Sequence, residues 1–226
     1  MRYRDIHKAI FISRPNRFIA KVELNGKEEI VHVKNTGRCR ELLVPGCTVY
    51  LEKSGNAARR TAYDLVAVQK GELLINMDSQ APNKVFGEWA ERGSFRKDLT
   101  LLKTETVWGR SRFDFYWEAG EEQGFVEVKG CTLEENGLAL FPDAPTERGV
   151  KHLEELVLAQ QEGYLCTICF VLQMKGCHSF RPNEITHPEF ADALRKAAQA
   201  GVRIVAMDCI VTPDSLEIDQ SVPVDL

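Results

Sequence analysis

The sequence predicts a small β-barrel followed by an α/β domain with a mixed sheet. The first eighty residues contain five short segments of strand character that are separated by turn residues. From Ala81 onward, segments of helical and of strand periodicity alternate along the chain. No Ser- or Gly-rich linker separates the two halves, so we expect closely packed domains at residues 1–80 and 81–226.

The expected barrel begins with RFIAKVEL, which alternates in the strand manner and runs into the hairpin turn Asn25-Gly26. The five expected strands cover residues 17–24, 29–33, 48–52, 62–69 and 73–76. Five short strands in this length fit an OB-fold, which often binds single strands or oligosaccharides, and an SH3-like barrel fits nearly as well. An oligosaccharide-binding barrel would need aromatic platforms, which this segment largely lacks.

In the expected α/β domain, the clearest helix is 146–162, where apolar residues recur at helical spacing before Gly163. Further helices are expected over KVFGEWAER (84–92) and over 187–200. The expected strands are 99–108, 110–117, 123–129, 165–172 and 202–211. This order of helix, three strands, helix and strand indicates a mixed sheet between helical layers.

The composition is that of an ordinary globular chain, with 44% hydrophobic and 27% charged residues. The segment MRYRDIHKAIFISR has no apolar run of signal-peptide length, and no run in the sequence is long enough to span a membrane. The seven cysteines show no disulfide framework and fit a reducing compartment. We therefore expect a cytoplasmic protein with no membrane partner. A homodimer is compatible with the sequence, which leaves the oligomeric state open.

Charge is distributed unevenly along the chain, whose net charge is −4. Residues 1–60 hold 13 Lys and Arg against 6 Asp and Glu, whereas the remainder is strongly acidic. A basic module can contact phosphates even when the whole chain is acidic, because the local field steers a polyanion. The alternative is a basic but merely solvated sheet face. The candidate nucleic-acid contacts in this module are Arg14, Arg17, Arg38, Arg40, Arg59 and Arg60.

A pair of acids and a lysine stand out on two successive expected strands. Asp114 interrupts the aromatic segment SRFDFYW, and Glu127 and Lys129 share one face of GFVEVKG. If the hairpin is centred on the connection 118–123, residues whose numbers sum to 241 are paired, which sets Asp114 opposite Glu127. Opposed like charges destabilise a sheet unless they are compensated. A divalent cation, Mg²⁺ or Mn²⁺, would compensate them, because it accepts a few hard oxygen ligands from the protein.

This acid pair and lysine suit phosphodiester hydrolysis, in which positioning and charge neutralisation do most of the work. Lys129 would orient an attacking water and stabilise the negative charge that forms. On the preceding helix, the helical wheel places Glu88 at the border of the Val85/Phe86/Trp89 stripe, which makes it the candidate third acid. The bland interpretation is a surface hairpin with an ordinary Glu/Lys pair and a solvated Glu88.

The segment before the clearest helix, FPDAPTERG (141–149), adds candidate contacts. Thr146 is the expected N-cap, and the free amides of the first turn could receive a phosphate together with Arg148, Lys151 and His152. A structural turn and cap explains the same residues without a ligand. Asp143 is a weaker candidate for a metal contact.

The arrangement resembles the PD-(D/E)xK nuclease superfamily, with Asp on one strand and Glu-x-Lys on the next. A narrower resemblance rests on NTGRCRELLVPG (35–46), SRFDF (111–115), VEVKGCTL (126–133) and ALFPDAPTERGVKHLEEL (139–156). These strings are similar to the sugar fermentation stimulation protein (SfsA) family. The resemblance implies an N-terminal OB-like domain, a PD-(D/E)xK nuclease-like domain, DNA binding with little sequence preference and a link to sugar (maltose) utilisation. It also places the nuclease-like motif on Asp114, Glu127 and Lys129, with Glu88 as the helix acid.

The sequence therefore predicts a DNA-binding protein with a Mg²⁺-dependent nuclease-like site. The competing hypothesis is a regulator of sugar metabolism that binds DNA without cleaving it.

Overall fold

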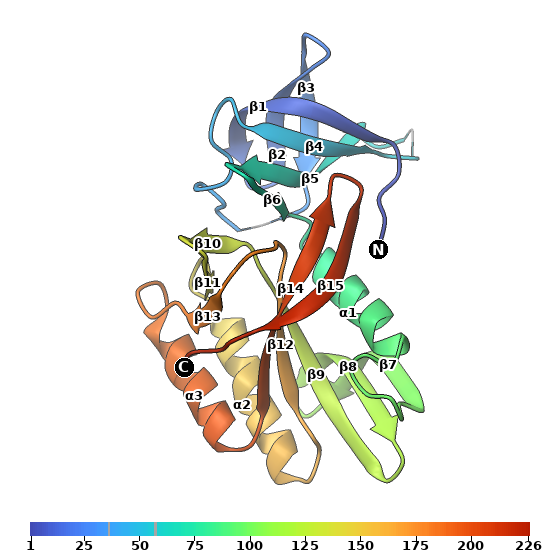
Figure 1. Ribbon diagram of the computed structural model, residues 1–226, viewed down its shortest axis with the longest axis vertical. Coiled ribbons are helices and arrows are strands. Elements are labelled where there is room, and N and C mark those ends of the chain that lie inside the picture. The colour runs from blue at the N-terminus through green and yellow to red at the C-terminus, as the bar shows by residue number, and fades with distance from the viewer. Residues whose placement is uncertain (36, 57) are drawn as a thin grey trace.

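The computed structural model describes residues 1–35, 37–56 and 58–226 and places a β-barrel above an α/β domain (Figure 1). The barrel region comprises β1 (Ile6–Asn16), β2 (Ile19–Leu24), β3 (Lys27–Val33), β4 (Thr48–Lys53), β5 (Tyr63–Lys70) and β6 (Leu73–Asn76). The main sheet of the second domain comprises β7 (Leu101–Trp108), β8 (Ser111–Ala119), β9 (Glu122–Cys131), β12 (Thr167–Leu172), β14 (Arg203–Thr212) and β15 (Ser215–Val222). A smaller sheet comprises β10 (Leu133–Glu135), β11 (Leu138–Phe141) and β13 (Ser179–Pro182), and the helices are α1 (Ala81–Glu91), α2 (Glu147–Gln161) and α3 (Pro188–Gln199).

The barrel closes because β3 pairs with β5 as well as with β2. The ladder then runs β1-β2-β3-β5-β4 and returns to β1, which confirms an OB-like barrel. The β2–β3 hairpin turns at Asn25 and Gly26, both with positive φ, as the Asn-Gly pair predicts. The long strand β1 was not expected as a separate element, although its alternate residues Ala9 and Phe11 are buried in the barrel core.

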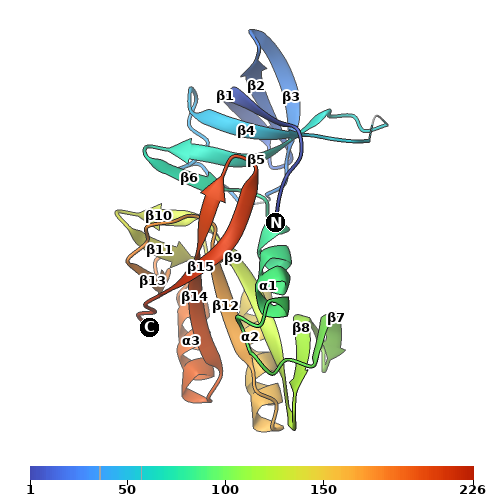
Figure 2. The same cartoon turned by 45° about the vertical axis from the view of Figure 1, so that its right-hand side comes forward.

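The main sheet of the second domain has the order β15-β14-β12-β9-β8-β7. β12 lies parallel to both β9 and β14, whereas the outer pairings are antiparallel, so the expected mixed sheet is confirmed. Helix α1 covers one face, where Phe86 packs on Phe115. Helices α2 and α3 cover the other face with Leu156 and Leu194 (Figure 2). These two helix-covered faces give the domain a three-layer architecture.

Thr146 caps α2 as predicted, since its hydroxyl accepts a hydrogen bond from the Gly149 amide at 3.1 Å. The small sheet β10-β11-β13 lies between the barrel and α3 and was not predicted. Its three- and four-residue strands are too short to show periodicity. Among the helices of the described residues, none has the length and apolar composition needed to span a bilayer.

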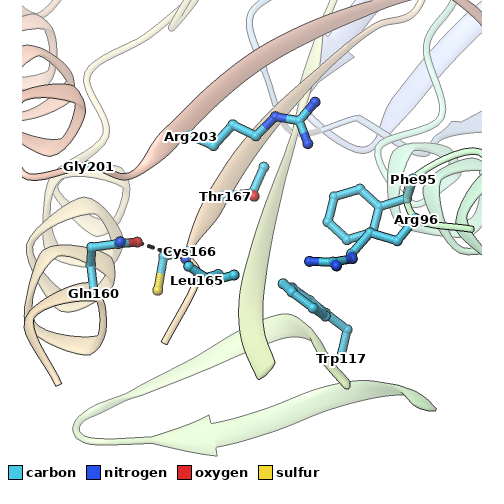
Figure 3. Close-up of a pocket in the computed structure, with 9 residues that line it drawn as sticks. All are labelled: Phe95, Arg96, Trp117, Gln160, Leu165, Cys166, Thr167, Gly201 and Arg203. Atoms are coloured by element: carbon cyan, nitrogen blue, oxygen red, sulfur yellow. Dashed lines mark hydrogen bonds between the residues drawn. The ribbon is translucent and has the colours of Figure 1, made fainter. Parts of the chain in front are cut away.

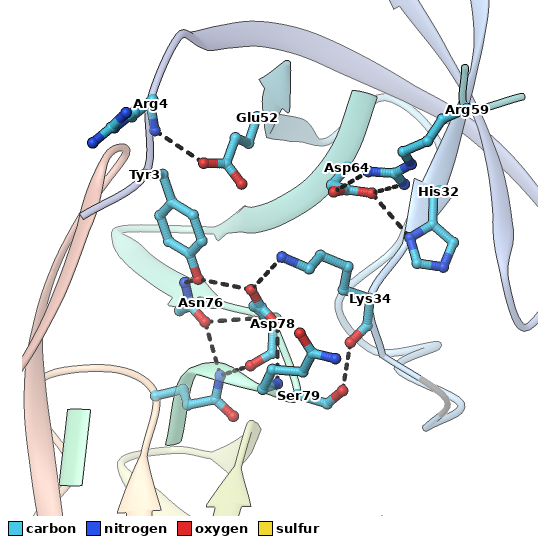
Figure 4. A network of polar contacts seen from close by, with 12 residues as sticks. Tyr3, Arg4, His32, Lys34, Glu52, Arg59, Asp64, Asn76, Asp78 and Ser79 are labelled. Carbon is cyan, nitrogen blue, oxygen red and sulfur yellow. Dashed lines mark hydrogen bonds and ion pairs between the residues drawn. The ribbon is translucent and has the colours of Figure 1, made fainter. Parts of the chain in front are cut away.

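A buried polar network joins the two domains where the barrel ends (Figure 4). Asp78 is 2% exposed and pairs with Lys34 of the barrel at 2.8 Å. From the second domain, the Gln173 side-chain amide donates to the Asn76 side chain at 2.8 Å and to the Asp78 carbonyl at 3.0 Å. The Tyr3 hydroxyl contacts both Asn76 and Asp78. Because each buried polar group here has partners from another element, the network fixes how the barrel sits on the sheet.

Candidate functional site

The hairpin of β8 and β9 presents the acid pair in the register that the sequence predicts. Phe115 pairs with Val126, and the ladder continues to Ala119 and Glu122, so paired residue numbers sum to 241. The ladder stops one residue short of Asp114. Glu127 and Lys129 alternate with Val126 and Val128, which pack on the α1 face. Their own side chains therefore lie on the α2 face.

Asp114 lies where the side-chain alternation of β8 breaks. Phe113 packs against Phe125 on the α2 face, whereas Phe115 packs against Phe86 of α1, although the two phenylalanines are two residues apart. The main-chain ladder between β8 and β9 does not extend to Asp114, and the side chain of Asp114 makes the next contact with β9. It accepts a hydrogen bond from the Val128 amide at 2.8 Å and another from the Asn83 side chain at 2.7 Å. The Asp114 carboxylate thus reaches the main chain between Glu127 and Lys129 from the α1 side of the sheet, whereas the Glu127 side chain lies on the α2 side.

Glu127 is 1% exposed, and its two carboxylate oxygens differ sharply in their contacts. Oε1 accepts hydrogen bonds from both His152 Nδ1 and Lys129 Nζ. Oε2 is buried and has no hydrogen-bond partner among the described residues. A buried carboxylate oxygen without a partner is costly, so such an atom in a folded protein calls for an explanation.

The pKa values of Asp114 and Glu127 shift in opposite directions. Burial raises the pKa of Asp114, and the negative charge of Glu127 raises it further. Burial acts on Glu127 in the same direction, but the hydrogen bond from His152 and the charge of Lys129 outweigh it and lower the pKa of Glu127. Glu127 is therefore ionised at neutral pH, and the Asp114 carboxylate is close enough to feel its charge.

The donor set suits a hard divalent cation. Within the described ranges, no three His, Cys, Asp or Glu side chains come together as a ready-made metal cluster. Two carboxylates are nevertheless sufficient for Mg²⁺, which usually keeps several waters and binds substrate phosphate. A cation would give Glu127 Oε2 the partner that it lacks among the described residues, and it would relieve the repulsion between Glu127 and Asp114. Asp114 and Glu127 are the residues that would hold it.

Glu88 does not make the contact with the acid pair that the sequence analysis assigns to it. Its side chain is 34% exposed and pairs with the Met1 amino group at 2.7 Å. Glu88 and Asp114 both line a hollow of about 490 Å³ between α1 and the sheet. Asn83, one turn earlier on α1, reaches Asp114 instead. Glu88 is therefore partly exposed, which agrees with its place at the border of the apolar stripe on the helical wheel.

His152 is the site residue whose role the sequence analysis missed. It was considered as a phosphate contact, but it is 5% exposed and bonds to Glu127. Its other ring nitrogen lies 3.3 Å from Arg148 Nε, so the exposed Arg148 stands at the edge of the site. A signal was present in the sequence, because His152 follows the buried Gly149 by three residues and precedes the buried Leu156 by four.

A cleft of about 300 Å³ between the domains is lined on the sheet side by Gly130, the residue that follows Lys129 in the chain. The barrel side of the cleft includes Asn35 and Gly37, and the opposite side is the 141–146 loop before α2. A Cβ at Gly130 would lie 2.5 Å from Gln173 Oε1 and 2.7 Å from a Pro82 side-chain atom, so only glycine fits. Asp143 lies against Gly37 in this cleft, and no contact in the described residues brings it to Glu127.

The cleft leads to a basic surface on the barrel, where a hollow of about 440 Å³ shares Gly37 and Ala144 with it. Exposed Arg17, Arg38 and Arg40 line this hollow, and we name these three residues the arginine surface. Phe18, half exposed, lies next to them with its ring 6.0 Å from the Arg17 guanidinium carbon. The structure thus brings four of the six predicted arginines to the mouth of the interdomain cleft, and three of the four are exposed.

Arg14 lines the same hollow but has a structural role. Its two terminal nitrogens donate to four main-chain carbonyls at 2.6–2.8 Å, those of Arg17, Asn35, Gly37 and Arg38. All four terminal N–H groups are therefore committed to the loop after β3. The expectation that Arg14 contacts phosphate is corrected on this ground, because the guanidinium holds the loop that carries Arg38 and Arg40.

Arg59, Arg60 and Lys151 stand apart from the arginine surface. Arg59 makes a bidentate ion pair with buried Asp64 at 2.6 and 2.8 Å, and His32 also contacts this carboxylate (Figure 4). The pair fixes Arg59 within the barrel. Arg60 is exposed on the loop between β4 and β5, on the other side of the barrel from the loop after β3 (Figure 1). Lys151 donates to the Arg110 carbonyl at 2.8 Å and holds the β7–β8 turn.

The closed barrel, the mixed sheet and the buried acid pair define a two-domain protein in which an OB barrel is joined to an α/β domain with a candidate metal centre. Profile comparisons assign the same two parts. Residues 12–77 match the SfsA N-terminal OB domain, and residues 80–215 match the sugar fermentation stimulation protein RE domain. The chain belongs to the sugar fermentation stimulation protein family.

Relatives cover the whole chain. A sugar fermentation stimulation protein homolog from Desulfitobacterium hafniense is 59% identical over 226 residues, covering 100% of this chain and 99% of that protein. A homolog from Ruminiclostridium cellulolyticum is 55% identical and covers 100% of both chains. Among solved structures, Pyrococcus furiosus SfsA in complex with Ca²⁺ superposes with a TM-score of 0.90 at 27% identity, covering 100% of this chain and 98% of that one. The fold and the resemblance predicted from the sequence are both confirmed.

Proposed function

We propose that this protein binds DNA and hydrolyses phosphodiester bonds with the help of a divalent cation, Mg²⁺ or Mn²⁺. The observation that carries the proposal is Glu127, a buried and ionised carboxylate beside a second carboxylate, Asp114, with one oxygen that has no partner among the described residues. The solved relative from Pyrococcus furiosus was obtained in complex with Ca²⁺. Ca²⁺ and Mg²⁺ both prefer oxygen ligands, which supports a cation at the acid pair of this chain.

Each side chain of the site has a role that follows from its contacts. Asp114 and Glu127 would hold the cation, which when bound would withdraw charge from the scissile phosphate and acidify an attacking water. His152 donates to Glu127 and keeps it ionised, and thus acts as a positioning residue. Lys129 lies beside Glu127 with its side chain 17% exposed, so its ammonium can orient water and neutralise the developing charge.

The interdomain cleft gives the substrate a path to these groups. It is lined by Gly130, the residue after Lys129, and adjoins the arginine surface, so a phosphate chain that enters the cleft meets positive charge at the barrel. Half-exposed Phe18 beside Arg17 offers a face on which a base can stack. We propose that the barrel grips the strand and that the sheet carries out the reaction. The seven free thiols, six of them buried, fit a cytoplasmic protein.

A second candidate function is a regulator of sugar (maltose) metabolism that binds DNA and does not cleave it. The observation that favours it is that Lys129 and His152 already bond to Glu127 without a cation. In this alternative the three side chains form a buried ion network that stabilises the sheet, and the arginine surface alone carries the function.

The deciding experiment incubates the purified protein with single-stranded and with double-stranded DNA, each with Mg²⁺, with Mn²⁺ and with EDTA. We expect cleavage in the presence of either metal and none with EDTA. The Glu127→Gln variant should retain DNA binding and lose cleavage. If the wild-type protein binds DNA but cleaves neither substrate with either metal, the enzyme proposal fails and the regulator remains.

A further inference from the structure

A second pocket lies at the end of the main sheet, where β8, β12 and β14 meet the last turn of α2 (Figure 3). It has a volume of about 300 Å³ and opens between the segment that follows α1 and the strands β8, β12 and β14. Thr167 of β12 pairs with Val126, whose side chain packs on the α1 face, so the floor of the pocket belongs to that face. The proposed nuclease chemistry uses none of its lining residues.

The polar groups that line this pocket are almost all hydrogen-bond donors. Arg203 enters from β14 and Arg96 from the segment after α1, on different sides of the pocket in Figure 3. Thr167 adds a hydroxyl, and Gln160 adds an amide nitrogen, because its carbonyl oxygen already accepts from the Cys166 main chain at 2.9 Å. In the part of the chain that the structure describes, no Asp or Glu side chain lines the pocket.

Trp117 forms part of the pocket wall. Its side chain lines the pocket, and the residue is 2% exposed. Its indole Nε1 is buried without an acceptor among the described residues. The ring therefore contributes an apolar wall rather than a donor to the pocket.

Arg96 is held in place before any ligand arrives. Its guanidinium lies over the Trp117 ring, with 4.7 Å between the guanidinium carbon and the ring centroid. Asp98 and Glu122 bind its Nε and Nη2 from outside the pocket at 2.6–3.1 Å, and these contacts leave Nη1 unused. A preorganised guanidinium with an unused nitrogen binds an oxyanion at a lower entropic cost than a mobile one.

We propose that this pocket binds a small organic oxyanion, a molecule with a phosphate or carboxylate group, between Arg96 and Arg203. The Thr167 hydroxyl and the Gln160 amide supply the remaining donors. A volume of about 300 Å³ suits a small metabolite. None of the lining residues belongs to the acid pair, so this inference stands whether or not the protein cleaves DNA.

The experiment follows the indole N–H signals of the full-length protein by ¹H–¹⁵N NMR. The chain has three tryptophans, and the Trp117→Phe variant assigns the signal of Trp117. Inorganic phosphate, acetate and glucose 6-phosphate are each titrated at constant ionic strength, with chloride and unphosphorylated glucose as controls. We expect the Trp117 signal to shift saturably with at least one of the three anions, while the signals of Trp89 and Trp108 stay in place.

Comparison of the three anions identifies the source of the oxyanion. Saturation by phosphate and glucose 6-phosphate supports a phosphate ligand, and saturation by acetate at similar concentration supports a carboxylate. The Arg203→Gln variant, which changes an exposed side chain, should weaken binding at least tenfold. The Arg92→Gln variant, whose arginine is exposed but lies outside the pocket, should bind like the wild-type protein.

Three results would overturn the proposal. The first is a Trp117 signal that none of the anions shifts saturably. The second is equal affinity in the Arg203→Gln variant and the wild-type protein. The third is a shift produced by a single-stranded oligonucleotide but by none of the small anions, which would assign the pocket to the nucleic acid.

Discussion

Two buried carboxylates, one in each domain, are paired with the same kinds of side chain but in different ways. Asp64 of the barrel contacts Arg59 and His32, and Glu127 of the sheet contacts Lys129 and His152. Both oxygens of Asp64 have partners in the structure, whereas Glu127 Oε2 has none within the described residues.

The difference separates a structural ion pair from a candidate reactive site. Both carboxylate oxygens of Asp64 are occupied, because each accepts a hydrogen bond from one terminal nitrogen of the Arg59 guanidinium. At Glu127 one carboxylate oxygen, Oε2, has no partner within the described residues, and a second acid, Asp114, lies beside it. An ion pair that serves only stability has no need of either feature. Substitutions at the two clusters should therefore have opposite consequences.

The largest expected effect is on cleavage. If the Lys129 ammonium assists the attacking water, Lys129→Met should lower the cleavage rate by about 10²–10⁴-fold with the metal still bound. In the barrel, the double variant Arg59→Gln/Asp64→Asn removes the matched pair and should cleave at the wild-type rate. The measurement is single-turnover cleavage of labelled DNA. Equal losses in the two proteins would mean that the two clusters are not functionally distinct.

The next largest effect is on stability, and here the order of the two clusters reverses. Asp64→Asn leaves Arg59 without its charged partner and should lower the free energy of unfolding by about 2–3 kcal/mol, since Arg59 is partly exposed. Burial and the charge of Glu127 raise the pKa of the Asp114 carboxyl, so its ionised form is disfavoured in the folded protein. The Asp114→Asn substitution should therefore leave the free energy of unfolding unchanged or raise it, within about 1 kcal/mol. Urea unfolding measures both values. A loss at Asp114 as large as that at Asp64 would contradict the comparison.

A smaller effect is expected on the salt dependence of DNA binding. Each phosphate contact contributes roughly −0.9 to the slope of log K against log salt on duplex DNA. Replacing Arg38 and Arg40 by Ala should therefore make the slope shallower by up to about 2. The Arg59→Gln/Asp64→Asn variant should leave it unchanged. Fluorescence anisotropy at several salt concentrations tests this, and an unaltered slope in the Arg38/Arg40 variant would place the phosphate contacts elsewhere.

The smallest effect is on the pH dependence of stability. Burial alone would raise the pKa of Asp64, but the hydrogen bonds from Arg59 and His32 hold it below its usual value. A carboxyl with a lowered folded-state pKa stabilises the protein above its unfolded pKa of about 3.9, and that contribution is lost as the pH falls through the folded pKa. The stability gap between wild-type and Asp64→Asn proteins should thus narrow below about pH 4. A gap that stays constant from pH 6 to pH 3 would show that ionisation of Asp64 contributes nothing.

The sequence predicts the sheet hairpin better than it predicts the barrel surface. Strand alternation and the centre of a short connection were sufficient to set Phe115 opposite Val126, and with it the neighbourhood of Asp114 and Glu127. Both signals are local in the chain. The same is true of the Thr146 cap, which is defined by contacts within one helical turn.

The roles of individual arginines depend on contacts that are distant in the sequence. Arg14 donates to main-chain carbonyls 21 to 24 residues away as well as to nearby Arg17, and no local pattern marks it as the residue that holds that loop. Asn83 likewise reaches Asp114 across 31 residues. His152 is the intermediate case, because its helical spacing indicated the buried face but not its partner, Glu127.

The central claim is that Asp114 and Glu127 hold a divalent cation. Isothermal titration with Mn²⁺ of the wild-type, Glu127→Gln and Asp64→Asn proteins, each checked for folding by circular dichroism, tests it most directly. The account predicts one Mn²⁺ site in the wild-type protein, an affinity at least tenfold lower in Glu127→Gln and an unchanged affinity in Asp64→Asn. Equal Mn²⁺ affinity in the wild-type and Glu127→Gln proteins would contradict it.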